Sequence, residues 1–270
     1  MAFSSMVKFG AMNFPARPIL AELEAVWEMG FDLIEITIDP PEATPEKLLA
    51  NRDQISNALS AHGMDAIAHL PCFVRTADLY DSIRYASRME VFKAIDALPE
   101  LGIRVANLHP SYISRMARHM GDYAHRLGID FLRAALERAE EKGIGIRIEN
   151  MCPSDGWLSE PEEFEEIFEA FPGLGLTLDL GHANLSAPRN RSIEFLRRFG
   201  RRVAHLHVHD NFGSSDEHLP PFCGNVDFIG IFSAIKRSGY DGTMTLEVFS
   251  KDRDYLRLAL EKVKALWRSI

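Results

Sequence analysis

Cysteine and long apolar runs are scarce in this chain. Only three of its 270 residues are cysteines, Cys72, Cys152 and Cys223, and no two of them form a Cys-x-x-Cys pair. A disulfide framework is therefore not expected, and such cysteine usage is typical of a reducing compartment. No apolar run approaches the ~18 residues of a membrane-spanning helix. Because Met1–Gly10 also lacks the basic and apolar regions of a signal peptide, we expect a cytoplasmic protein with no membrane partner.

Basic residues are outnumbered by acidic ones. Asp and Glu together count 39 and Lys and Arg 30, which gives a formal net charge of −9. Proteins that hold phosphate backbones usually carry a basic face, so the charge argues against nucleic acid as a partner. The apolar fraction of 46% and the charged fraction of 26% are typical of a globular protein and exclude a collagen-like, coiled-coil or disordered chain.

Several catalytic motifs are also missing. The sequence contains no Gly-x-x-x-x-Gly-Lys-Ser/Thr phosphate loop and no Gly-x-Ser-x-Gly nucleophile elbow. No candidate strand has an internal lysine placed for Schiff-base chemistry, because Lys8 opens the first strand at the wrong end. Nucleotide hydrolysis, serine hydrolysis and Schiff-base chemistry are therefore poorly supported.

Short apolar runs alternate with longer segments of helical period along the whole chain. The candidate strands are Val7–Asn13, Leu33–Ile38, Asp65–Leu70, Val105–His109, Gly145–Glu149, Gly175–Asp179, Val203–His207 and Thr243–Val248. The candidate helices are Ile19–Met29, Pro45–His62, Asp81–Leu101, Tyr123–Lys142, Glu160–Ala170, Ser192–Phe199, Phe228–Ser238 and Asp252–Trp267.

This alternation predicts an α/β protein with a parallel sheet. Eight strand–helix units in a chain of this length fit one closed (β/α)8 barrel, the TIM barrel, over residues 1–270. The rival is a doubly wound open sheet, which usually has a glycine-rich turn after its first strand. Here that position reads Gly-Ala-Met-Asn-Phe-Pro over residues 10–15, which is not that motif. We expect a single-domain barrel.

Polar residues gather at the carboxyl ends of the candidate strands, which is the catalytic end of such a barrel. Seven of the ten histidines lie there or in the loop after the seventh strand, together with several carboxylates. The residues concerned are Glu35, His69, His109, Glu149, Asp179, His182, His205, His207, His209, Asp210, Asp216, His218 and Glu247. Imidazoles and carboxylates that converge in this way predict a divalent metal site, of a kind that suits zinc, manganese, iron or cobalt.

Each of these residues has a simpler interpretation when taken alone. A single strand-end histidine such as His69 or His109 is more often a hydrogen-bonded structural residue, and Asp179-x-x-His182 is short enough to arise by chance. Glu149 and Glu247 end apolar strands, where a carboxylate needs a partner. The prediction depends on the coincidence of all of them at one end of the barrel. Among the histidines of the seventh strand we favour His207 as the ligand.

The sequence resembles the xylose isomerase-like TIM barrel superfamily over nearly its whole length. The motifs are Arg-Ile-Glu-Asn at Glu149, Leu-Asp-Leu-Gly-His at Asp179, His-Leu-His-Val-His-Asp at His207 and Leu-Glu-Val at Glu247. These four residues look like the metal ligands that the superfamily shares. The resemblance implies that Glu149 and Glu247 are also the acid and base of a sugar or sugar phosphate isomerase or epimerase, with His182, His209 and Asp210 as substrate-binding candidates.

The resemblance extends to the endonuclease IV branch of the superfamily. In that branch His69, His109 and Glu149 look like the ligands of one metal, the four shared residues like those of a second, and His182, Asp216 and His218 like those of a third. One to three ions of zinc, manganese or cobalt per chain are therefore expected. The sequence departs from the relatives after Asp216, where Phe-Cys-Gly-Asn at residues 222–225 replaces their usual Gly-Glu-Gly.

Two enzymatic functions of different classes remain open, and a non-enzymatic metal- or ligand-binding barrel is a third, less favoured alternative because of the full set of strand-end residues. The first is a metal-dependent isomerase or epimerase that forms an enediolate of a small sugar or sugar phosphate. The alternative is a phosphodiesterase that cleaves abasic DNA. Metal ions would neutralise Glu149, Asp179, Asp216 and Glu247, so the −9 net charge disfavours DNA less than the count suggests. Related sugar enzymes are often dimers or tetramers, which leaves a homo-oligomer as a further alternative.

Overall fold

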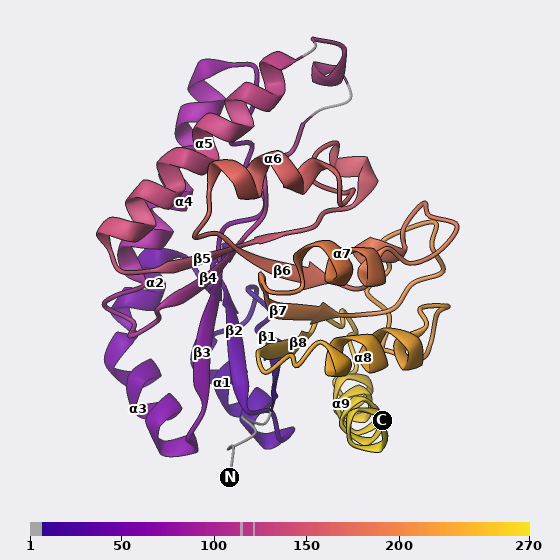
Figure 1. The fold of residues 1–270 in the computed structure, drawn as a ribbon. Coiled ribbons are helices and arrows are strands. Elements are labelled where there is room, and N and C mark those ends of the chain that lie inside the picture. The colour runs from indigo at the N-terminus through magenta and orange to yellow at the C-terminus, as the bar shows by residue number, and fades with distance from the viewer. Residues whose placement is uncertain (1–6, 114–115, 121) are drawn as a thin grey trace.

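The computed structural model describes residues 7–113, 116–120 and 122–270 (Figure 1). Each strand pairs in parallel with the next one along the chain, and the eighth pairs with the first, so the sheet closes into a barrel. Helices surround the strands on the outside. The prediction of a (β/α)8 barrel is confirmed. The first six residues, which belong to the segment where no signal peptide is expected, lie outside the described part.

The strands are short and begin and end close to the predicted positions. They are β1 (Lys8–Met12), β2 (Leu33–Thr37), β3 (Asp65–His69), β4 (Val105–Leu108), β5 (Gly145–Glu149), β6 (Gly175–Asp179), β7 (Val203–Val208) and β8 (Thr243–Leu246). In register, Asp179 pairs with His207 and His69 pairs with Asn107, so residues from successive strands reach one end of the barrel together.

The helices follow the strands in the predicted order. They are α1 (Ile19–Glu28), α2 (Pro45–Ala50), α3 (Arg52–His62), α4 (Asp81–Ala97), α5 (Asp122–Glu141), α6 (Glu163–Ala170), α7 (Ser192–Phe199), α8 (Phe228–Arg237) and α9 (Asp254–Ser269). Short 3-10 turns η1 (Ala117–Met120), η2 (Pro153–Asp155) and η3 (His182–Asn184) lie in the loops. No helix in the described ranges is long and apolar enough to cross a membrane, and a cytoplasmic location stays a prediction.

The prediction of one helix over Pro45–His62 is wrong, because the segment forms α2 and α3. The break falls at Asn51, whose side chain donates a hydrogen bond to the carbonyl of Lys47 at 2.8 Å. A side-chain amide that bonds to a nearby backbone carbonyl competes with the helical hydrogen bonds there. Helix α4 ends earlier than predicted, at Ala97, because Pro99 has no N–H group with which to continue it.

Two layers of buried side chains lie on either side of the barrel wall. The outer layer, between strands and helices, is apolar and includes Phe131, Phe164, Phe195, Phe228 and Phe232. The inner layer fills the barrel and is largely polar toward its carboxyl end. Nine of its polar side chains have no exposed surface: Glu35, Asn107, Glu149, Thr177, Asp179, His205, His207, His209 and Thr245. Interiors of this fold are usually packed with branched apolar residues, so the polar interior needs a chemical reason.

Candidate metal centre

Glu149, the last residue of β5, lies at the centre of the polar interior. Its Oε2 lies 3.3 Å from His109 Nε2 and 3.7 Å from His69 Nε2. Its Oε1 lies 3.2 Å from His207 Nδ1 and 3.3 Å from His182 Nδ1. The two oxygens of one carboxylate thus face different sets of imidazoles, which is the arrangement of a bridging ligand.

The four shared positions come together as the sequence motifs predict. His207 Nδ1 lies 3.3 Å from Glu247 Oε2 and 3.7 Å from Asp179 Oδ2, in addition to its contact with Glu149. One ligand atom from each of these four side chains can be chosen so that all lie within 4.8 Å of one another. His69, His109 and Glu149 form a second such group on the other side of the Glu149 carboxylate.

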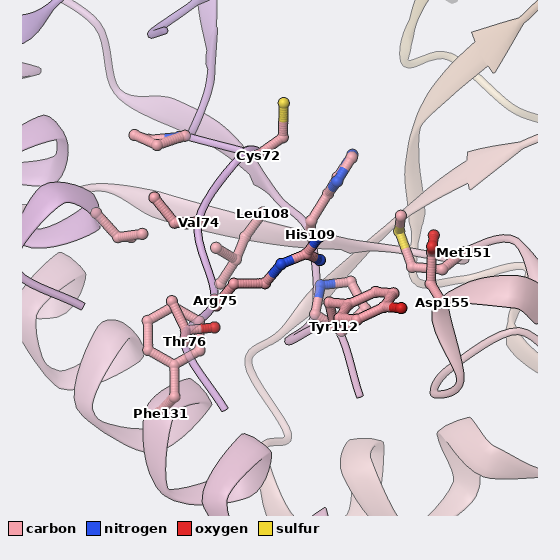
Figure 2. Close-up of a pocket in the computed structure, with 13 residues that line it drawn as sticks. Cys72, Val74, Arg75, Thr76, Leu108, His109, Tyr112, Phe131, Met151 and Asp155 are labelled. Atoms are coloured by element: carbon pink, nitrogen blue, oxygen red, sulfur yellow. The ribbon is translucent and has the colours of Figure 1, made fainter. Parts of the chain in front are cut away.

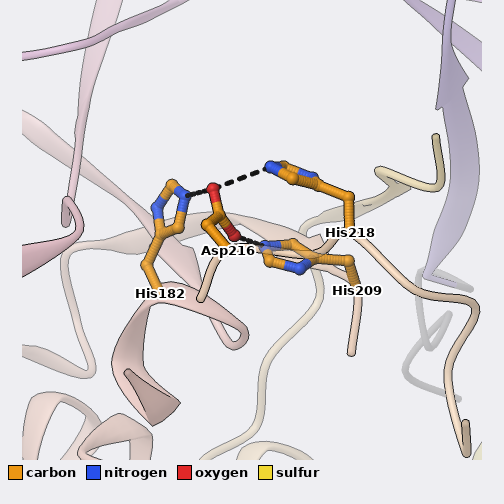
Figure 3. Close-up of side chains that lie close together, drawn as sticks. All are labelled: His182, His209, Asp216 and His218. Atoms are coloured by element: carbon orange, nitrogen blue, oxygen red, sulfur yellow. Dashed lines mark hydrogen bonds and ion pairs between the residues drawn. The ribbon is translucent and has the colours of Figure 1, made fainter. Parts of the chain in front are cut away.

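A third group surrounds Asp216, which comes from the loop after β7 (Figure 3). Asp216 lies 2.9 Å from His218 Nε2, 3.3 Å from His182 Nε2 and 3.7 Å from His209 Nε2. His209, a substrate-binding candidate from the sequence, belongs to this group, and its Nε2 also lies 3.1 Å from Asp179 Oδ1.

Each of four histidines is fixed through one ring nitrogen and presents the other to the cluster. His69, His182 and His218 place Nδ1 within 3.1, 2.9 and 3.1 Å of the backbone carbonyls of Leu70, Asn150 and Glu247. A carbonyl only accepts, so Nδ1 carries a proton, and Nε2 is the nitrogen that faces the cluster and would bind a metal once it is deprotonated. His207 is reversed, because its Nε2 faces Glu35 and its Nδ1 faces the cluster. Anchored imidazoles of this kind are typical of metal ligands.

Several buried atoms of the cluster lack hydrogen-bond partners among the described residues. They are both oxygens of Glu149, Asp179 Oδ2, His207 Nδ1, both ring nitrogens of His209, and Glu247 Oε2. Buried polar atoms are almost always hydrogen-bonded, and each exception calls for an explanation. These atoms lie close to one another without the geometry of hydrogen bonds, as lone pairs do when they point at a common centre. The nitrogen and oxygen donors suit zinc, manganese or cobalt.

In the metal-free protein the charged side chains of the cluster strongly shift one another's pKa values. Burial raises the pKa of Glu149, but the neighbouring His207 and His109 lower it by a larger amount. The resulting pKa is well below the ordinary range of a glutamate. Burial lowers the pKa of His218, and the charges of Glu247 and Asp216 oppose this and raise it to about 9. These pKa shifts favour an ionised Glu149 and a protonated His218 when no metal is bound.

A second polar network lies directly beneath the cluster and contains Glu35 and His205, which are among the polar residues from which the sequence predicts a metal site. Glu35 on β2 lies 3.0 Å from His205 Nε2 and 3.1 Å from His207 Nε2. Asn107 donates to Glu35 and accepts from Thr177 Oγ1 at 2.6 Å, which fixes the carboxylate. The feature of the sequence that points to this network is Glu35, a glutamate inside the apolar strand Leu-Ile-Glu-Ile-Thr. Its partner could not be read from the sequence, because His207 lies 172 residues further along the chain.

Asp210, a substrate-binding candidate, contacts backbone rather than the cluster. Its Oδ1 accepts from the N–H groups of Asn211 at 2.9 Å and Val226 at 3.1 Å, and its Oδ2 accepts from Gly224 at 2.7 Å. A Cβ at Gly224 would lie 2.4 Å from Asp210 Oδ1, so glycine is required for this contact. The carboxylate thereby holds the two ends of the long loop between β7 and α8 together.

Two backbone features place the third group. A Cβ at Gly181 would lie 2.1 Å from the ring of His209, so the imidazole occupies space that only glycine leaves open. His218 has a φ of 46°, which is uncommon for residues other than glycine, although histidine adopts positive φ more often than most. Such backbone strain persists where surrounding contacts hold the residue, and it is common at functional sites.

A small pocket adjoins the first group at His109 (Figure 2). The guanidinium carbon of Arg75 lies over the ring of Tyr112, 4.0 Å from its centroid, and Cys72 and Asp155 line the same pocket. Cys72 Sγ donates to Asp39 at 3.3 Å, and burial raises the pKa of its thiol. The thiol is thus neutral and is not prepared to act as a metal ligand.

The sequence profile that describes a xylose isomerase-like TIM barrel matches residues 23–267. The chain belongs to this family. Among its relatives is the ketose 3-epimerase of Arthrobacter globiformis, 26% identical, with 96% of this chain and 86% of that protein covered. The L-ribulose-5-phosphate 3-epimerase UlaE of Escherichia coli O1:K1 is 28% identical, with 86% and 82% covered. The crystal structure of a D-tagatose 3-epimerase-like protein superposes with a TM-score of 0.85 at 27% identity, over 97% and 98% of the two chains.

Proposed function

We propose that the protein is a metal-dependent isomerase or epimerase of a small sugar or sugar phosphate. The observation that carries the proposal is the pair Glu149 and Glu247. Glu149 is the last residue of β5 and Glu247 directly follows β8, and both approach His207 Nδ1, at 3.2 and 3.3 Å. Two buried carboxylates that face one centre from different strands can exchange protons with a carbon held between them. The names of the relatives, which include 3-epimerases of a ketose and of a ketose phosphate, support this assignment.

Glu149, Asp179, His207 and Glu247 would hold the ion of the active site. A divalent ion in this position would polarise the substrate carbonyl and lower the cost of the enediolate formed on proton removal. One glutamate takes the proton from the carbon next to the carbonyl, and the other returns a proton to the intermediate. Return to the opposite face of the same carbon gives an epimer, and return to the neighbouring carbon gives an isomer.

Glu35 acts through His207 in this mechanism. It accepts the Nε2–H of His207, which leaves the Nδ1 lone pair directed at Glu149 and Glu247. A carboxylate behind a ligand imidazole fixes its tautomer and its orientation and increases its basicity. Glu35 is therefore a positioning residue, and His205 fixes it from the other side.

The test is turnover of a panel of ketoses, aldoses and their phosphates with added manganese, cobalt or zinc. We expect turnover that depends on the metal and is lost in both Glu149→Gln and Glu247→Gln. Solvent-derived deuterium at the carbon next to the carbonyl would identify the exchanged proton. If both variants retain wild-type turnover, the two-glutamate mechanism is wrong.

A second candidate is a phosphodiesterase acting on abasic DNA, which the three ligand groups around Glu149 and Asp216 favour. A cluster of ions can activate water and stabilise a leaving oxygen. Incubation with an abasic duplex separates the two functions, because an isomerase leaves the strand intact. Three tightly bound ions per chain together with strand cleavage would favour this candidate, and the absence of both cleavage and salt-dependent DNA binding would reject it.

A further inference from the structure

A cavity lies beside the metal centre, on the seam where β1 meets β8. Its volume is about 470 Å³, and it is lined by the residues that follow these two strands and by the first turn of α9. Leu246 and Val248 form part of its wall, and Glu247 lies between them in the chain. Phe249 connects the two sites, because it lines the cavity and its ring stacks on that of His218, with 4.3 Å between the centroids. A ligand that reaches past Phe249 would therefore have one end at the metal centre and the other in the cavity.

The charge of the cavity is opposite to that of the whole chain. Arg17, Lys251 and Arg253 line it, and none of its described lining residues is acidic. Arg253 binds the buried Glu22 through both carboxylate oxygens, and Arg17 reaches Glu22 only at 4.0 Å. Lys251 forms no ion pair with another described residue. Arg17 and Lys251 therefore offer positive charge to a ligand of this cavity, in a protein of net charge −9.

A buried donor also lines the cavity. Asn13, which follows β1, is 3% exposed, and its Oδ1 accepts the backbone N–H of Thr37 at 2.7 Å. Its Nδ2 has no hydrogen-bond partner among the described residues. An unpaired buried N–H group is costly unless a ligand or water completes it. The rest of the wall is apolar, with Phe14 and Phe249 as exposed aromatic rings.

We propose that this cavity binds the phosphate group at the far end of the substrate. The cavity then makes the protein an enzyme of sugar phosphates rather than of neutral sugars. Arg17 and Lys251 supply the charge, Asn13 supplies a donor, and the phenyl rings contact the carbon chain of the sugar. Phosphate binding to the cavity stands on the lining residues alone, whereas its use as a substrate site rests on the proposed function.

The experiment is a calorimetric titration of the metal-loaded protein with inorganic phosphate. We expect a single phosphate per chain and about tenfold or greater loss of affinity in Lys251→Gln and in Arg17→Gln, since each removes a charged hydrogen-bond donor. Lys262→Gln is the matched control, because it removes the same charge from an exposed position further along α9. Lys251 has no recorded ion pair to lose, so Lys251→Gln keeps the test valid if Arg17→Gln folds poorly. Wild-type affinity in Lys251→Gln, or an equal loss in Lys262→Gln, would overturn the proposal.

Phosphate could also bind to the metal ions, and Glu149→Gln separates the two sites. Binding that survives in Glu149→Gln and is lost in Lys251→Gln places the phosphate in the cavity, and the reverse pattern contradicts the proposal. The titration does not depend on turnover. A protein that binds phosphate in the cavity but converts no sugar would therefore refute the proposed function alone. If sugar is converted, Lys251→Gln should raise KM for a ketose phosphate by about tenfold.

Discussion

The two buried layers of the barrel have opposite chemical character. The layer between strands and helices is apolar, and rings such as Phe164, Phe195 and Phe199 pack there with centroids 5.3 to 6.5 Å apart. The interior of the barrel is equally buried but carries Glu35, Glu149, Asp179 and His207 without exposed surface. The first layer stabilises the fold by removing apolar surface from water. The second holds desolvated charge, which costs free energy unless it is paired.

The outer layer therefore stabilises the fold, and the interior of the barrel carries the candidate metal ligands. A residue of the outer layer should matter for folding and leave metal affinity unchanged, and a residue of the interior should do the reverse. Proteins commonly trade stability for a reactive site in this way. Three substitutions and one change of pH test whether stability and metal binding depend on different layers.

The largest effect is expected from Glu149→Gln. The change removes the carboxylate that both of its groups share and one partner of the proton exchange, so kcat should fall by about 10²–10⁴-fold. Metal content by mass spectrometry should fall with it, while the midpoint of chemical denaturation of the metal-free protein changes little by comparison. Glu166→Gln on the exposed surface of α6 is the control and should retain activity and metal. Full activity in Glu149→Gln would mean that the interior charge has no catalytic role.

Phe164→Ala should affect the other layer. Phe164 has no exposed surface and contacts the rings of Phe168, Phe195 and Phe199. Its truncation leaves a cavity and should lower the free energy of unfolding by about 3–5 kcal/mol, measured by urea denaturation. The metal affinity of the folded protein should stay at the wild-type value. If Phe164→Ala binds metal more weakly but has the wild-type free energy of unfolding, the assignment of stability to the outer layer and metal binding to the interior is wrong.

Glu35→Gln tests whether the network beneath the cluster serves the metal. Loss of the carboxylate behind His207 should weaken metal binding by about 10–100-fold, and the absorption spectrum of bound cobalt should shift because the imidazole is reoriented. Glu22→Gln is the matched control: Glu22 is a second buried glutamate, but it pairs with Arg253 outside the barrel. It should lower stability and leave the cobalt spectrum unchanged. Identical spectra in wild type and Glu35→Gln would show that the network is only structural.

The smallest effect concerns pH. In the metal-free protein the pKa of His218 is raised to about 9, so the imidazole is protonated at neutral pH. Metal binding at the group around Asp216 must displace that proton, and the pKa of His182 in the same group is raised as well, so affinity should rise at least about tenfold per pH unit at neutral pH. The same raised pKa stabilises the metal-free fold fully below about pH 6.5, and this contribution is lost as pH rises toward 9. Competition with a chelator at pH 7 and 8 measures the slope, and an affinity independent of pH would contradict the assignment.

The sequence was sufficient for the barrel and for most of the cluster. Residues such as Glu149 and Asp179 end strands whose period is clear, and parallel strands bring their ends together regardless of the distance between them in the chain. His209 and Glu35 were harder, because their partners depend on which side chains meet inside the barrel. The break at Asn51 was missed because a single side-chain hydrogen bond decides it.

The loop that carries Asp216 and His218 begins and ends close to one point on the rim of the barrel. Asp210 and Leu219 form an antiparallel bridge across its base, and Asp210 fixes its return to α8 through Gly224 and Val226. Both ends of the insertion therefore meet at one place on the rim of the barrel. During evolution such a loop can be lengthened, exchanged or deleted without breaking the pairing of any two strands in the closed sheet. Asp216 and His218 can thus be gained or lost by a descendant of this chain while Glu149 on β5, Asp179 on β6, His207 on β7 and Glu247 after β8 are kept.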